Sequence, residues 1–163
     1  MSRRNHIIML CTGNICRSPM AEKLVEQALI LEPAPLNEVQ VISAGVAAGY
    51  GNPASYNSVL ALEEHNLDLN PHKSQPLTAE LMEQAFAIFG MTQSHLDLVH
   101  ACYPEAEASV HLHLFREFMG NQTPEIPDPY GASLDAYREC RDAIIEAVPS
   151  LVGYLKEKYI ARA

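Results

Sequence analysis

The part of the chain with the clearest chemical character is residues 11–19, which read CTGNICRSP. This segment follows a short apolar stretch of β-forming residues and precedes a stretch of helical period, so it is expected to be a strand-to-helix turn. Backbone N–H groups converge at such a turn, and together with the helix dipole they bind anions. The sequence therefore predicts a phosphate-binding loop over residues 11–18, with phosphate held by Thr12, Gly13, Asn14, Ile15, Cys16, Arg17 and Ser18.

The side chains of this loop are suited to nucleophilic catalysis. The positive potential favours thiolate over thiol, which makes Cys11 an attacking group at neutral pH. Arg17 can hold two phosphate oxygens with its planar guanidinium as charge builds in the transition state. Gly13 and Asn14 tolerate the backbone angles of a tight turn, and the Ser18 hydroxyl can donate to the Cys11 sulfur as it leaves. No metal is required for this chemistry.

Several β-prone segments, separated by stretches of helical period, must position this loop, and that pattern is typical of a parallel sheet. Strands are expected at 7–10, 39–43, 86–89 and 110–114, and helices at 19–31, 53–66, 79–84, 93–102 and 133–159, the last kinked or split by Pro149. We expect one α/β domain over residues 1–163, with a four-stranded parallel sheet in the order 2-1-3-4 and helices on both faces. Such sheets bind ligands at the carboxyl ends of their strands.

Charge and composition exclude several classes of function. The net charge of -9 disfavours nucleic acid as a partner, because a polyanion is repelled by an acidic surface. The apolar runs are far shorter than the roughly 20 residues of a membrane span, and no signal peptide is recognisable. The four cysteines do not resemble a secreted disulfide framework. We expect a cytoplasmic protein that does not bind membranes.

The string CTGNICRSPMAE at residues 11–22 resembles the signature of the low-molecular-weight protein tyrosine phosphatase family, Cys-x5-Arg-Ser after the first strand. That family places its general acid in an Asp-Pro-Tyr motif near the C-terminal end, where this chain has Asp128-Pro129-Tyr130 in a loop with many prolines. The resemblance implies catalysis by Cys11, Arg17 and Asp128 through a phosphocysteine intermediate, without a cofactor. It also implies a phosphorylated protein as substrate, with a tyrosine kinase as an associated partner; a monomer is expected.

The resemblance extends to residues outside the two motifs. Ile42-Ser43-Ala44-Gly45 is similar to the end of the second strand in the family, and Pro71-His72-Lys73 stands where members keep a histidine. In the family, the matching positions form a hydrogen-bond network that holds the loop in shape. The implied loop-supporting residues are Asn14, Ser18, Ser43 and His72.

The expected substrate pocket is a deep slot that favours tyrosine over the shorter phosphoserine. Tyr130 is expected to form one wall, and Ile15 is the residue type of the tyrosine-specific members. The aromatic residue often found four positions beyond the Ser-Ala-Gly glycine is replaced by Gly49. We expect the adjacent Tyr50 to substitute for it.

A protein-arginine phosphatase of the same family is the first alternative. Met91-Thr92-x-x-His95 resembles that branch, as does Gly131 after the Asp-Pro-Tyr motif. The branch carries threonine at the position of Ile15, however, and the interpretation as a tyrosine phosphatase is therefore preferred. A thiol-dependent arsenate reductase is less favoured, since Cys102 would need a second nearby cysteine where Met91-Thr92 stands. A non-catalytic phosphate-binding module would have no use for both a nucleophile and an acid.

Other cysteines and histidines have simpler interpretations. Cys16 is either inert or the partner of Cys11 in a protective disulfide under oxidants. Cys102 and Cys140 lie on expected helices and are interpreted as bystanders. The spacing of the remaining histidines does not indicate a metal site: His65, His95, His100, His111 and His113.

Overall fold

The computed structural model describes residues 4–120 and 123–162, apart from the side chain of residue 107. In this part of the chain one sheet is formed by four parallel strands, which are β1 (His6–Cys11), β2 (Gln40–Gly45), β3 (Ala85–Gly90) and β4 (His111–Leu114). Their order is β2-β1-β3-β4. The α/β class and the strand order expected from the sequence are confirmed.

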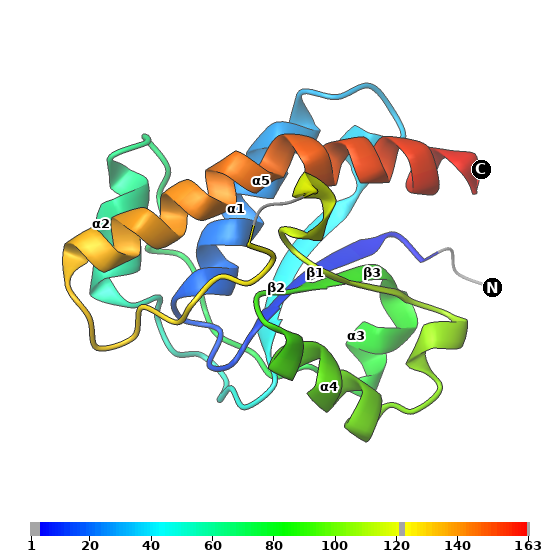
Figure 1. Cartoon of the computed structure of the whole chain (residues 1–163), viewed down its shortest axis with the longest axis horizontal. Coiled ribbons are helices and arrows are strands. Elements are labelled where there is room, and N and C mark those ends of the chain that lie inside the picture. Colours follow the sequence, from blue (N-terminus) through cyan, green and yellow to red (C-terminus); the bar gives the residue numbers. More distant parts are fainter. Residues whose placement is uncertain (1–3, 121–122, 163) are drawn as a thin grey trace.

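Helices cover both faces of the sheet (Figure 1). The elements α1 (Arg17–Ile30), α2 (Tyr56–Glu63) and α5 (Leu134–Ala161) lie on one side, and α3 (Ala79–Gln84) and α4 (Gln93–Cys102) lie on the other. Three short 3-10 helices that the sequence did not suggest join them in the described residues: Leu36–Glu38, Ala106–Ala108 and Glu117–Met119. None of the helices in the described residues is long and apolar enough to cross a membrane.

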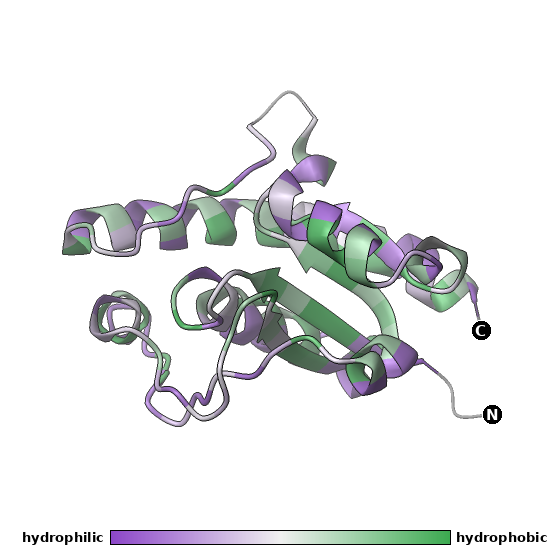
Figure 2. Ribbon diagram, turned by 90° about the horizontal axis from the view of Figure 1, so that it is seen from below, coloured by the Kyte–Doolittle hydropathy of each residue, from purple (hydrophilic) through white to green (hydrophobic). Residues whose placement is uncertain are grey.

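The two faces of β1 belong to two separate parts of the core. Ile7 and Met9 pack with side chains of α1 and α5, whereas Ile8 and Leu10 pack with side chains of α3 and α4. The central strands are apolar on both faces for this reason, as expected for a covered parallel sheet. Figure 2 shows this as strands coloured hydrophobic between helices of mixed colour.

Two helices differ from their expected form. The helix expected at 53–66 spans only Tyr56–Glu63, and the backbone N–H of Ser55, directly before it, donates to the carbonyl of Ile15 at 2.8 Å. The sequence predicted that Pro149 would kink or split the last helix, and of these a split is wrong, since α5 runs unbroken from Leu134 to Ala161. Pro149 lies on the exposed side of α5, while Ala147 and Leu151 on the opposite side are buried in the core.

The register brings the carboxyl ends of all four strands to one edge. Cys11 pairs with Gly45, Leu10 pairs with Gly90, and Gly90 pairs with Leu114. The neighbours of β1 lie on its two sides and are reached by connections in opposite directions, which is the arrangement that opens a ligand crevice in sheets of this kind. The loop after Cys11 lies at this point.

Gly45 supplies the first testable prediction, because a Cβ atom there would lie 2.4 Å from the carbonyl oxygen of Thr12 and 2.8 Å from Ala48 Cβ. Gly45→Ala must displace the backbone of the phosphate-binding loop, so we expect it to lower the free energy of unfolding by about 2 kcal/mol or more. Urea unfolding measures this loss.

Gly90→Ala is the matched control at the end of β3. The nearest atoms to a Cβ there belong to the Leu96 side chain, at 3.0 and 3.2 Å, and a leucine side chain can move. We expect a smaller loss of stability in this variant. Equal losses of unfolding free energy in the two variants would show that the Thr12 backbone moves away from a new Cβ as readily as the Leu96 side chain does.

Candidate active site

The phosphate-binding loop is held from outside by its own carbonyl groups. Among residues 11–16, five carbonyls accept hydrogen bonds from segments beyond the loop. The pairs are Cys11 O with Val46 N at 2.9 Å, Thr12 O with Ala47 N at 2.9 Å, Asn14 O with His72 Nε2 at 2.7 Å, Ile15 O with Ser55 N at 2.8 Å, and Cys16 O with Ser58 Oγ at 3.2 Å. Because these carbonyls point away from the loop centre, the peptide N–H groups are left to face it.

The loop encloses a cavity of about 270 Å³ at the N-terminus of α1. In the described part of the chain, no backbone N–H of residues 12–16 donates a hydrogen bond to another residue. Asn14 and Cys16 are buried residues, and buried N–H groups are nearly always paired in folded proteins, so their unpaired N–H groups indicate an anion site. The cavity is lined by Cys11, Thr12, Gly13, Ile15, Cys16, Arg17, Asp128 and Tyr130.

A directed chain of hydrogen bonds ends on the Cys11 sulfur. Asn14 Nδ2 donates to Ser18 Oγ at 2.8 Å, and Ser18 Oγ lies 2.9 Å from Cys11 Sγ. Because the Ser18 oxygen already accepts from Asn14, its proton is available to the sulfur. A donor in this position stabilises negative charge on the thiolate, whether before attack or after departure.

Asn14 is the centre of the support network. Its φ of 58° is left-handed, its side chain is fully buried, and its Oδ1 accepts from the backbone N–H of Gln75 at 2.9 Å. His72 donates from Nε2 to the Asn14 carbonyl, and burial lowers the pKa of His72, which favours the neutral ring. The structure thus brings Asn14, Ser18 and His72 together as placed from the sequence, and it adds Gln75.

Ser43 contributes differently. Its side chain is buried beside Glu22 of α1, a carboxyl group whose pKa is raised by burial, and no hydrogen bond joins it to Asn14 among the described residues. The Ser43 carbonyl instead accepts from Gln75 Nε2 at 3.0 Å. Within the described residues, the hydrogen bonds connect Ser43 to the loop through Gln75, which lacks any distinctive motif in the sequence.

Arg17 links the phosphate-binding loop to the acid loop, here residues 123–133. The guanidinium is buried, its Nη1 donates to the carbonyl of Ile126 at 2.9 Å, and its Nη2 lies 3.6 Å from Asp128 Oδ2. Its Nε is buried without a hydrogen-bond partner among the described residues. An oxyanion in the cavity would supply the missing acceptor.

Asp128 and Tyr130 reach the cavity from the acid loop. The Tyr130 backbone N–H donates to Asp128 Oδ1 at 3.0 Å, which orients the carboxyl group and leaves Oδ2 toward Arg17. The Asp128 side chain is 48% exposed, so water can reach it. Residues 121 and 122 of the expected loop lie outside the described residues.

Tyr50 does not line the cavity. Its side chain is 73% exposed, and the turn that carries it is fastened elsewhere: Gly51 N donates to Ser74 O at 2.9 Å, and Ser74 Oγ donates to Gly49 O at 2.6 Å. The prediction that Tyr50 replaces the missing aromatic residue in the cavity wall is therefore wrong, because Tyr50 is not among the residues that line the cavity. Ile15 and Tyr130 do line the cavity.

His95 belongs to the site, although the sequence analysis noted it only within the Met91-Thr92-x-x-His95 resemblance and found no metal-site spacing among the histidines. Its Nδ1 accepts the backbone N–H of Thr92 at 3.1 Å, so Nε2 carries the proton and donates to Thr12 Oγ1 at 3.0 Å. Burial, and secondarily the charge of Arg17, lowers the pKa of His95 to about 4. The Thr92-x-x-His95 spacing is that of a helix capping box, which was the available signal. No cluster of metal-binding side chains occurs within the described ranges.

The buried His95 predicts a pH-dependent stability. Its pKa of about 4 lies below the ordinary 6.5, so the unfolded chain binds more protons between these values and stability is lost as pH falls through them. The shift corresponds to about 3 kcal/mol. We expect His95→Gln to lose less stability than wild type between pH 7 and pH 4.5 in urea unfolding. The exposed His65 provides the control, and a His65→Gln profile as flat as that of His95→Gln would contradict the assignment.

Comparison with known proteins gives a consistent result. The family model described as low molecular weight phosphotyrosine protein phosphatase matches residues 6–161. The protein-arginine-phosphatase of Bacillus subtilis (strain 168) is 39% identical over 151 residues, which cover 93% of this chain and 97% of the relative. The probable low molecular weight protein-tyrosine-phosphatase AmsI of Erwinia amylovora is 33% identical over 151 residues, with coverage of 93% and 97%.

Among solved structures, the YwlE arginine phosphatase from Geobacillus stearothermophilus superposes with a TM-score of 0.83 at 31% identity, covering 97% of each chain. The family match spans both the phosphate-binding loop and the acid loop. The chain therefore belongs to the low-molecular-weight phosphotyrosine protein phosphatase family.

Proposed function

We propose that this protein hydrolyses phosphotyrosine in proteins through a phosphocysteine intermediate. The observation that carries the proposal is the convergence of Cys11, Arg17 and Asp128 on one cavity, beside loop N–H groups of residues 12–16 that donate no hydrogen bond among the described residues. A nucleophile, a cation for the phosphoryl oxygens and an acid for the leaving group are thus arranged around a single anion site.

The first step transfers the phosphoryl group to sulfur. Loop N–H groups and Arg17 bind the phosphoryl oxygens, and the Cys11 thiolate attacks phosphorus in line with the tyrosine oxygen. As the P–O bond breaks, protonated Asp128 gives its proton to that oxygen, and tyrosine leaves as a neutral phenol.

The second step restores the thiolate. The Asp128 carboxylate, exposed enough to meet water, takes a proton from a water molecule as its oxygen attacks phosphorus. The S–P bond breaks, inorganic phosphate forms, and the Ser18 hydroxyl at 2.9 Å donates to the departing sulfur. Neither step calls for a cofactor.

The walls of the cavity support tyrosine as the substrate residue. Ile15 presents an apolar side chain, and Tyr130 offers an aromatic ring that is 70% exposed at the rim. A phenyl ring can pack against both, whereas a phosphoserine would leave these apolar surfaces in water. The description of the matched family, phosphotyrosine protein phosphatase, agrees with this choice.

Phosphoarginine is the second candidate substrate. It is favoured by the 39% identity to the protein-arginine-phosphatase of Bacillus subtilis. Thr12 is a polar group on the cavity wall, and its oxygen, held by His95, can accept a hydrogen bond from a guanidinium N–H. Ile15 remains the argument against it, because an apolar side chain offers no partner to a guanidinium.

Arsenate reduction has less support. Cys102 is the last residue of α4, a helix of ten residues whose first turn contacts the phosphate-binding loop through His95. Cys102 lies seven residues after His95, so at about 1.5 Å per residue it is on the order of 10 Å along the helix from that contact. It lines a different cavity, with Arg4 and Val110. A relay between Cys11 and Cys102 would need a large rearrangement.

The cellular setting completes the proposal. We place the chain in the cytoplasm as a monomeric, single-domain enzyme that acts on phosphorylated proteins, with a tyrosine kinase supplying the substrate. The family membership supports a phosphorylated protein as substrate. Cys16, whose pKa is raised by burial and whose sulfur lies 3.4 Å from the Tyr137 hydroxyl, is the residue that could pair with Cys11 under oxidants.

The test compares initial rates on a phosphotyrosine peptide and a phosphoarginine peptide, with Cys11→Ser as the blank. We expect faster release of phosphate from phosphotyrosine, and no turnover by Cys11→Ser although it still binds inorganic phosphate. Faster release from phosphoarginine would assign the chain to the second candidate. Turnover by Cys11→Ser would remove the nucleophile from the mechanism.

Ile15→Thr tests the selectivity argument separately. The hydroxyl replaces an apolar contact for the phenyl ring with a partner for a guanidinium, so the ratio of phosphoarginine to phosphotyrosine cleavage is expected to rise by about tenfold. Steady-state kcat/KM values on the same two peptides give this ratio. An unchanged ratio would show that Ile15 does not select the substrate.

A further inference from the structure

The acid loop is fastened to the rest of the protein immediately before Asp128. Among the described residues, three hydrogen bonds anchor positions 125 and 126. Ile126 N donates to Met91 O at 2.9 Å, Arg17 Nη1 donates to Ile126 O at 2.9 Å, and Gln93 N donates to Glu125 Oε2 at 2.6 Å. Only the last of these depends on a side chain of the acid loop itself.

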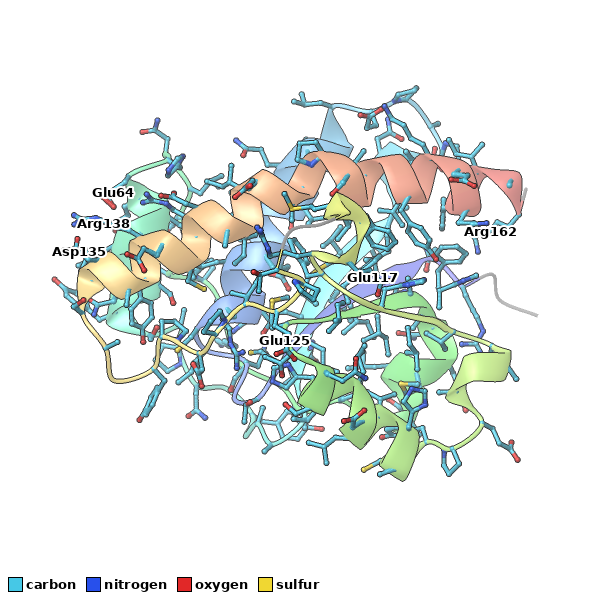
Figure 3. All side chains as sticks on the ribbon, in the orientation of Figure 1. Glu64, Glu117, Glu125, Asp135, Arg138 and Arg162 are labelled. Atoms are coloured by element: carbon cyan, nitrogen blue, oxygen red, sulfur yellow. The ribbon has the colours of Figure 1, made fainter. Side chains whose placement is uncertain are left out.

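Glu125 binds the first turn of α4. Gln93 is the first residue of that helix, so its N–H is one of those that lack an intrahelical partner. A carboxylate there gains both a short hydrogen bond and the favourable end of the helix dipole. Figure 3 shows Glu125 where the acid loop passes α4.

The chain between Glu125 and Asp128 is stiff, so fixing Glu125 also restricts the position of Asp128. Pro127 and Pro129 flank the acid, and Pro124 precedes Glu125. Proline fixes its own φ and restricts the residue before it, so few backbone rotations separate the anchored carboxylate from the catalytic one. The orientation of residue 125 therefore constrains the direction in which Asp128 points.

The helix that receives Glu125 is itself tied to the nucleophile's loop. His95, two residues after Gln93, donates to Thr12 next to Cys11. Glu125 and His95 thus attach the acid loop and the phosphate-binding loop to the same helical turn. The first turn of α4 therefore determines the distance between Asp128 and Cys11.

We propose that Glu125 is a positioning residue that holds Asp128 in place for protonation of the leaving group, by binding the N-terminus of α4. This inference rests on the proposed function, in which Asp128 is the acid. Glu125 does not touch the substrate. Its contribution appears only in the step where the tyrosine oxygen takes up a proton.

The experiment uses two aryl phosphates that differ in their need for an acid. Phenyl phosphate releases a basic phenolate that must be protonated, whereas p-nitrophenyl phosphate releases a much weaker base. For Glu125→Ala we expect kcat/KM to fall about tenfold on phenyl phosphate and less than about threefold on p-nitrophenyl phosphate, as a fraction of the 10²–10⁴ that acid catalysis supplies. Inhibition by inorganic phosphate should be unchanged.

Three further variants make the result decisive. Glu125→Gln keeps an oxygen acceptor for the Gln93 N–H and should recover most of the loss. Glu139→Ala removes an exposed carboxylate of α5 that lines a cavity together with Pro129 of the acid loop, and it should behave as wild type. Asp128→Asn should show the same dependence on the leaving group in stronger form.

The outcomes distinguish a failure of the role proposed for Glu125 from a failure of the role proposed for Asp128. Equal losses on both substrates, or no loss, would overturn the role of Glu125 while leaving Asp128 as the acid. A lack of leaving-group dependence in Asp128→Asn would overturn both. Thermal unfolding of Glu125→Ala and Glu125→Gln shows that the variants are folded, and Glu125→Gln alone decides the question if Glu125→Ala is not.

Discussion

The constraint on which the rest of this structure depends is the outward direction of the carbonyls in the phosphate-binding loop. A peptide group presents its N–H and its C=O in opposite directions, so N–H groups converge on a phosphate only if the carbonyls accept hydrogen bonds from donors outside the loop. Residues 46 and 47, residues 55 and 58, and His72 supply those partners. Much of the chain between β2 and α3 serves this purpose.

This constraint explains local features that would otherwise look unrelated. Asn14 adopts a left-handed conformation because the loop must reverse direction there, and its buried amide replaces backbone hydrogen bonds that the turn cannot make. Gly45 lacks a side chain because the Thr12 carbonyl approaches its backbone closely. Ser55, which directly precedes α2, gives its backbone N–H to the Ile15 carbonyl and so fixes the start of α2 against the loop.

The sequence predicted the elements and the chemical groups but not the contacts between distant segments. Strands of continuous apolar residues and the Cys11 to Arg17 spacing are local patterns, and they predicted the parallel sheet and the phosphate-binding loop, whereas Asp128 and Tyr130 were predicted from the family resemblance. Gln75 and Glu125 act through individual hydrogen bonds to residues far along the chain, and such bonds leave no periodicity or motif. The prediction that Tyr50 lines the cavity was wrong for the same reason, because the turn that carries Tyr50 is held by a hydrogen bond from Ser74 to Gly49.

The first turn of α4 explains how two loops from opposite ends of the sequence keep a fixed separation. His95 must remain neutral to accept from Thr92 and donate to Thr12 at once, and burial ensures this by lowering its pKa to about 4. The adjacent N–H of Gln93 is left for Glu125. Because this one turn contacts both loops, it fixes the position of Cys11 relative to Asp128. The distance between nucleophile and acid therefore depends on a few hydrogen bonds rather than on the long connection between β4 and α5.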